Sequence, residues 1–126
     1  MMTTDKELIG KAVSQIAGEA AYIRLRDEDF AHACPAPAWA IHVCGQSAGD
    51  VMARLEQELA QAGTGEPDGL VAYIRTASMT LAELTRIDGL LPHARRFRRG
   101  LAFLPDGSGT EVWIFADAGH DEEETQ

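Results

Sequence analysis

Apolar and polar residues in the middle of the chain follow the pattern of a strand, a glycine turn and a helix. Residues 38–44 form a short apolar run that is typical of a largely buried strand. A turn with glycine at both ends, residues 45–49, interrupts this run. Ser47 then has the position of a helix N-cap, and apolar residues at helical spacing continue to residue 62. The stretch predicts the first half of a βαβ unit.

The N-terminal segment has apolar residues at intervals of three and four, which predicts an amphipathic helix. Thr4 and Glu7 have the spacing of a capping box at its start. Residues 22–26 alternate as a strand would, and they equally suit the last turns of the helix. Because no strong breaker intervenes, we extend the helix to about Arg26.

The rest of the chain alternates between loops and short elements. A polar connection with two prolines fills residues 27–37, with a short helical turn at residues 28–32. The elements predicted after the central helix are a strand at residues 70–75, a helix from Thr80 to Leu91, and strands at residues 101–104 and 112–116. The segment PDGSGT between the last two strands has strong turn chemistry, which predicts a C-terminal β-hairpin.

This order predicts one small α/β domain over residues 1–116, with elements in the order α-β-α-β-α-β-β. Its four-stranded mixed sheet holds a βαβ unit, a third helix and the hairpin. Residues 117–126 are expected to form an acidic flexible tail. Over residues 38–116 the order of elements resembles that of thioredoxin-like domains, by analogy of order only. The chain lacks the second cysteine after Cys44 and the proline before the hairpin that carry the chemistry of that fold.

Composition and charge argue against several classes of function, among them nucleic-acid binding and membrane binding. The chain has 126 residues, a net charge of −9 and a pI of about 4.8. This acidity argues against direct binding to nucleic acid or to anionic membranes. No apolar run is long enough to span a membrane, and the N-terminus does not read as a secretory signal. With only two cysteines there is no disulfide framework, so we expect a cytoplasmic protein.

Cys44 is the candidate for thiol chemistry. It ends the predicted strand just ahead of a helix, whose dipole is expected to lower the pKa of the thiol. The backbone amides from Gly45 to Ser47 are in a position to hold an anion. The alternative is an ordinary glycine turn with an inert thiol.

Two His-x-Cys pairs suggest a metal site. The donors of tetrahedral zinc are present in His32, Cys34, His42 and Cys44, listed here as the candidate ligands. On a strand, His42 and Cys44 share one face. The spacing matches no common zinc motif, and the alternative is a set of ordinary histidines and buried cysteines.

A basic cluster lies before the predicted hairpin. Its members are Arg95, Arg96, Arg98 and Arg99. Four arginines in an acidic chain form a candidate binding surface for an acidic patch, a carboxylate or a phosphate. The alternative is a solvated loop whose arginines pair with acids of the same chain.

We therefore expect a non-catalytic protein-interaction module, of accessory, regulatory or inhibitory type, that docks on a protein partner. The first alternative is a thiol-dependent or thioredoxin-like domain that uses Cys44, and the weaker one is a zinc-stabilised domain. The sequence does not identify an enzyme or require a cofactor, and it leaves a homodimer open.

Overall fold

The computed structural model describes residues 1–62, 66–104 and 109–117. In chain order the elements are β1 (Met2–Thr3), α1 (Lys6–Ala17), α2 (Asp27–Ala33), β2 (Pro37–Gly45), α3 (Ala48–Ala62), β3 (Gly69–Thr76), α4 (Leu81–Leu90), β4 (Arg96–Phe103) and β5 (Thr110–Asp117). The predicted α/β class and mixed sheet are confirmed. The sheet has five strands, because the short β1 pairs with the middle of β2.

The strands lie in the order β1-β2-β5-β3-β4. Strand β5 is antiparallel to both of its neighbours, β2 and β3, whereas β3 and β4 are parallel. Hence β2 and β3, the strands of the predicted βαβ unit, run in the same direction with β5 between them.

The predicted C-terminal hairpin is wrong. β4 and β5 follow each other in the sequence, but β3 lies between them in the sheet. The reason is that β5 buries apolar side chains on both faces, so it gains more from the centre of the sheet than from its edge. The turn residues 105–108 lie outside the described residues. Since the hairpin was part of the thioredoxin-like order, the strand pairing gives that analogy no support.

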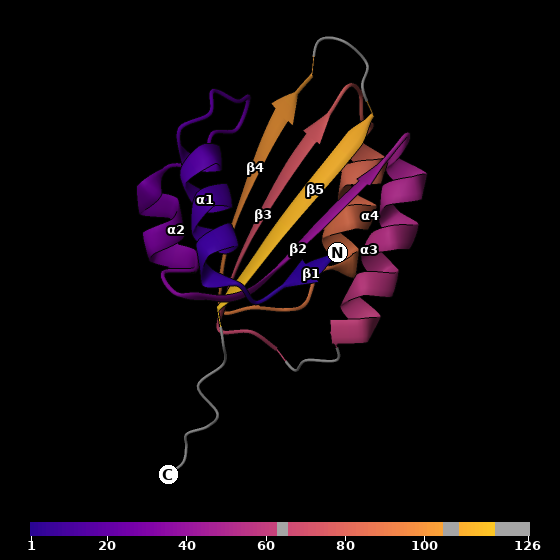
Figure 1. Ribbon diagram of the computed structural model, residues 1–126. Helices are drawn as coiled ribbons and strands as arrows, with labels where there is room; N and C mark the ends of the chain where they lie inside the picture. Colours follow the sequence, from indigo (N-terminus) through magenta and orange to yellow (C-terminus); the bar gives the residue numbers. More distant parts are fainter. Residues whose placement is uncertain (63–65, 105–108, 118–126) are drawn as a thin grey trace.

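Two layers of helices enclose the sheet (Figure 1). Helices α1 and α2 cover one face, and α3 and α4 cover the other. The α1/α2 layer meets the sheet in a core of Ile9, Ile16, Leu25, Phe30, Val71, Tyr73 and Phe115, among others. The α3/α4 layer packs on Ile41, Val51, Leu55, Leu70, Ile74, Ile87 and Ile114, among others. Strands β3 and β5 therefore contribute side chains to the cores on both faces.

The first helix is shorter than predicted. It ends at Ala17, where Gly18 caps it, and its N-cap is Asp5 rather than Thr4. The extension to Arg26 is wrong, because Ile23 leaves the helix and forms a β-bridge with Leu101 on β4. The pairing satisfies backbone groups that a helix would have satisfied internally.

Three local predictions are confirmed. The short helical turn is α2. The helix predicted from Thr80 is α4, which begins with a capping box of Thr80 and Glu83. Ser47 accepts a hydrogen bond from the Asp50 amide at the start of α3. The predicted tail at residues 117–126 lies outside the described residues, apart from Asp117, which ends β5. No helix in the described parts of the chain has the length and apolarity needed to cross a membrane.

Candidate functional site

Polar side chains form two rows across the sheet face that α1 and α2 cover. The register aligns Cys44 on β2 with Glu111 on β5, and Glu111 with Arg75 on β3. One step along, His42 is aligned with Trp113. His42 and Cys44 are two residues apart on one strand, and their side chains meet on one face, as the alternation predicted.

His42, Cys44 and Glu111 bring three different donor atoms together, and we call this set the Cys44 cluster. The His42 Nε2 atom makes a close hydrogen bond with Glu111 Oε2. The same Nε2 lies 3.5 Å from the Cys44 Sγ atom. The imidazole ring stacks on the indole of Trp113, with the ring centroids 4.1 Å apart. Strand register and stacking together fix the direction in which Nε2 points.

Arg75 holds the other side of the cluster. Its Nη1 donates to Glu111 Oε1 at 2.9 Å, and its Nη2 donates to Glu19 Oε1 at 2.6 Å. Burial opposes the charge of Arg75, but the hydrogen bonds to Glu19 and Glu111 outweigh it and raise the pKa of Arg75. The hydrogen bond from His42, helped by Arg75, lowers the pKa of Glu111 to about 2. Glu111 is therefore ionised at neutral pH and held at both oxygens.

The expected activation of Cys44 is wrong. Burial and the charge of Glu111 raise the pKa of the Cys44 thiol, although Arg54 and the N-terminal amine oppose them. In addition, the His42 Nε2 atom faces both the thiol and Glu111. A catalytic base that is oriented by a third group uses one ring nitrogen for each partner.

Residues Gly45 and Ser47, predicted to bind an anion, have structural roles. A Cβ atom at Gly45 would lie 2.7 Å from the Asp50 Cβ atom, so only glycine allows this close approach of the turn to α3. Ser47 caps α3 through the hydrogen bond described above.

The structure does not bring the two His-x-Cys pairs together. His32 and Cys34 precede β2, and His42 and Cys44 lie near its end. The seven steps from Pro37 to Cys44 span about 23 Å in a strand. One ion cannot reach both pairs, so the predicted four-ligand zinc site is wrong. Glu111, which sequence reasoning missed, joins the second pair instead.

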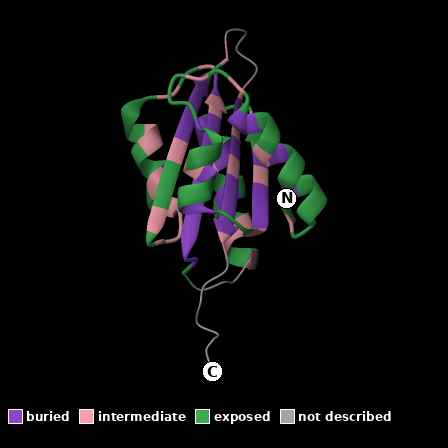
Figure 2. Cartoon of the chain, turned by 90° about the vertical axis from the view of Figure 1, so that its left-hand side faces the viewer, coloured by how far each residue is buried: buried purple, intermediate pink, exposed green. Residues whose placement is uncertain are grey.

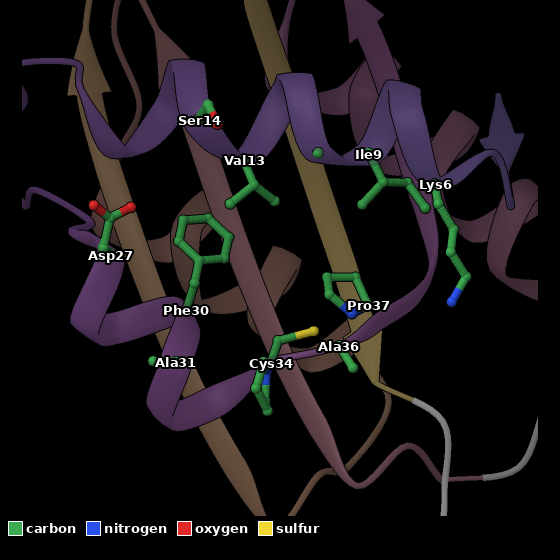
Figure 3. A pocket seen from close by; sticks show the side chains of 12 residues that line it. Lys6, Ile9, Val13, Ser14, Asp27, Phe30, Ala31, Cys34, Ala36 and Pro37 are labelled. Carbon is green, nitrogen blue, oxygen red and sulfur yellow. The ribbon is translucent and has the colours of Figure 1, made fainter.

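Cys34 belongs to a different environment. It is 1% exposed, and burial, followed by the charge of Asp117, raises the pKa of its thiol to about 12. Figure 3 shows its sulfur directed into a cleft between α1 and α2. The cleft has a volume of about 500 Å³, and its lining is mainly apolar, with Val13 and Phe30 among its walls. Nothing at this cleft identifies a ligand.

The predicted basic cluster divides into two partly buried, ion-paired arginines and two exposed arginines. Arg96 bonds to Asp68 at 3.1 Å and to the His32 carbonyl at 2.9 Å, and Arg99 pairs closely with Asp88. These two arginines therefore join β4 to its neighbours in the fold. By contrast, Arg95 is 81% exposed, and Arg98 is 44% exposed with its nearest acid, Asp29, at 3.4 Å.

Strand β4 forms one edge of the sheet, and half of that edge is exposed. Figure 2 shows exposed residues along the first half of the strand and buried residues beyond, apart from the exposed Phe103 at its end. Large apolar side chains lie along this edge: Phe97 is 38%, Phe103 50% and Tyr22 75% exposed. The rings of Tyr22 and Phe103 touch edge to face. We call Tyr22, Ile23, Phe97, Arg98 and Phe103 the β4 edge.

Comparison with known proteins gave no matching family and no matching curated protein.

Proposed function

We propose that the protein is a docking module that binds an extended, acidic segment of a partner protein along the β4 edge. The observation that carries the proposal is a sheet edge with exposed aromatic side chains and surface arginines. Aromatic residues and arginine are the side chains that contribute most to protein–protein binding. An open strand edge also offers backbone groups to an added strand.

The backbone of β4 supports strand addition next to Ile23. The backbone amide and carbonyl of Leu101 both bond to Ile23. The backbone N–H and C=O groups of the odd-numbered residues of β4 therefore point away from β3, toward the open edge. Among the described residues, the outward amides of Phe97 and Arg99 have no backbone partner. Beyond Ile23 the chain turns onto the α1/α2 face, where Leu25 packs beside Gly100. This turn leaves the edge free between Phe97 and Arg99.

Charge selects the occupant of this edge. Arg95 and Arg98 lie at the open part of the strand, and their ion pairs at the surface contribute little, so they are free to change partners. A second copy of the chain, paired through β4, would place arginines opposite arginines, which is destabilising. A partner strand with aspartate or glutamate at these positions gains both the backbone bonds and the ion pairs.

Thiol chemistry is the less favoured function. The raised pKa of Cys44 works against a thiolate, and its neighbour His42 is engaged by Glu111. Docking requires only the geometry of the edge strand.

Selection of random extended peptides on the immobilised protein tests the proposal. We expect the selected peptides to be enriched in aspartate and glutamate. Their affinity, measured by fluorescence anisotropy, should fall at least tenfold with Phe97→Ser and with Arg98→Glu. Leu81→Ser and Arg86→Glu are the matched controls, because both residues are exposed on α4 away from this edge.

Two results would overturn the proposal. One is a set of selected peptides without acidic enrichment. The other is a loss of binding in the α4 controls as large as the loss in the β4 variants.

A further inference from the structure

We infer that His42, Cys44 and Glu111 form a binding site for a divalent transition-metal ion, with Zn²⁺ as the best fit. This inference is independent of docking at the β4 edge, because β3 separates β4 from β5 and β2 in the sheet. In the described part of the chain, these three residues are the one set of three or more His, Cys, Asp or Glu side chains whose donor atoms converge. One ligand atom from each lies within 4.8 Å of the other two.

The spacing of two donors already suits zinc. Zn–S and Zn–N bonds of about 2.3 and 2.1 Å, meeting at a tetrahedral angle, put sulfur and nitrogen about 3.5 Å apart. Cys44 Sγ and His42 Nε2 are 3.5 Å apart. The third donor, Glu111 Oε2, now shares a hydrogen with Nε2. An ion at Nε2 would replace that hydrogen, and the neutral imidazole would then carry its single proton on Nδ1 instead of Nε2.

The donor set selects the class of metal. A thiolate, an imidazole and a carboxylate together suit zinc and its neighbours, whereas Mg²⁺ and Ca²⁺ prefer oxygen alone. Three protein ligands leave a fourth position for water. Solvent reaches the site, because Cys44 is exposed and the side chains of His42 and Glu111 are 26% and 23% exposed.

Charged groups of both signs surround the site. With Cys44 as thiolate, three negative groups (Cys44, Glu111 and Glu19) lie around Arg75, and Arg54 and the N-terminal amine also act on the thiol. Arg75 also acts from outside the ligand set. It holds Glu111 Oε1 at 2.9 Å, which leaves Oε2 as the single oxygen directed at His42. Orientation of a ligand by such a partner is typical of built metal sites.

Cys44 would bind the ion as a thiolate, so its thiol proton would leave the site when the metal binds.

Titration of the reduced, chelator-treated full chain with Co²⁺, followed by displacement with Zn²⁺, tests the site. We expect one Co²⁺ per chain, with the visible bands of a tetrahedral ion and a near-ultraviolet thiolate-to-cobalt band. Zn²⁺ should abolish both. Cys44→Ser should remove the thiolate band, and His42→Gln and Glu111→Gln should each weaken binding at least tenfold.

His32→Gln and Cys34→Ala are the matched controls, because they are the histidine and cysteine of the pair before β2. Both should keep the wild-type cobalt spectrum, and circular dichroism without metal establishes that every variant is folded. X-ray absorption at the zinc edge, measured on the wild-type chain, needs no variant. It should give one sulfur at about 2.3 Å with nitrogen or oxygen ligands at about 2.0 to 2.1 Å.

The inference is overturned if the wild-type chain gives no thiolate-to-cobalt band, or if the zinc edge detects no sulfur ligand. It is equally overturned if the band survives Cys44→Ser or disappears in Cys34→Ala. A failure of peptides to bind the β4 edge would leave all of these results unchanged, so the two proposals stand or fall separately.

Discussion

The imidazole of His42 lies nearly parallel to the indole of Trp113, with their planes inclined by 15° and their centroids 4.1 Å apart. The two residues are directly opposite each other on β2 and β5. This stacking explains why one ring nitrogen of His42 faces both Cys44 and Glu111. The Cys44 cluster is thus positioned by the central strands of the sheet rather than by a loop, and its contacts have measurable effects on stability.

Glu111→Gln should lower the free energy of unfolding at pH 7 by about 3 kcal/mol at most, at 1.36 kcal/mol per pH unit of pKa shift. The folded-state pKa is about 2, below the ordinary value of 4.5. The stabilisation is therefore complete well above pH 4.5, decreases as the pH falls below it and is lost near pH 2. Urea unfolding at pH 7 and pH 2.5 measures both values. If Glu111→Gln lowered the free energy of unfolding equally at both pH values, the lowered pKa of Glu111 would be contradicted.

Arg75→Met should destabilise the fold by about 3 kcal/mol, because it leaves the carboxylates of Glu19 and Glu111 close together without their cation. Combining it with Glu111→Leu removes part of that repulsion. The double variant should lose about 1 to 2 kcal/mol less than the sum of the single losses. A double-mutant cycle by urea unfolding gives this coupling, and strict additivity would argue that the residues act separately.

Two glycines should respond in opposite ways to alanine. A Cβ atom at Gly69 would lie 1.6 Å from the carbonyl oxygen of Ala33, so Gly69→Ala must displace backbone and should cost about 3 kcal/mol or more. At Gly89, inside α4, no atom lies within 4 Å of the added carbon. Gly89→Ala should stabilise the protein by up to about 1 kcal/mol. Thermal unfolding of both variants, compared with the wild-type protein, checks the two signs.

The two thiols should differ in reactivity. A chromogenic disulfide reagent at pH 8 should modify Cys44 in the native protein and reach Cys34 only on unfolding, because Cys34 is 1% exposed. Since the charge of Glu111 contributes to the raised pKa of Cys44, Glu111→Gln should speed its modification. Two native thiols that react at one rate would be inconsistent with this arrangement.

Most elements of the fold follow from local sequence. Periodicity and capping residues located α3, α4 and the strands β2 and β3, because each depends on side chains close together in the chain. The insertion of β5 between β2 and β3 was not predictable in this way. It depends on pairing between strands that are distant in the sequence. The bridge from Ile23 to Leu101 depends on the same kind of distant contact.

Two of the three residues of the Cys44 cluster could be predicted from the sequence. His42 and Cys44 are two residues apart on a strand, so their side chains were expected on the same face of the sheet. Glu111 lies 69 residues from His42, and only the register of β5 against β2 brings it to them. In the basic cluster, spacing alone does not distinguish the four arginines. Ion pairs with Asp68 and Asp88 assign Arg96 and Arg99 to the fold and leave Arg95 and Arg98 at the surface.

Amide hydrogen exchange of the wild-type chain, with and without the tightest acidic peptide, tests docking at the β4 edge most directly. An added strand bonds to the outward backbone groups of β4, so the amides of Phe97 and Arg99 should exchange at least tenfold more slowly in the complex. The amide of Leu101 is already bonded to Ile23 and should change least among the outward positions. Protection confined to another surface, or unchanged exchange at Phe97 and Arg99 with the peptide bound, would contradict the proposed function.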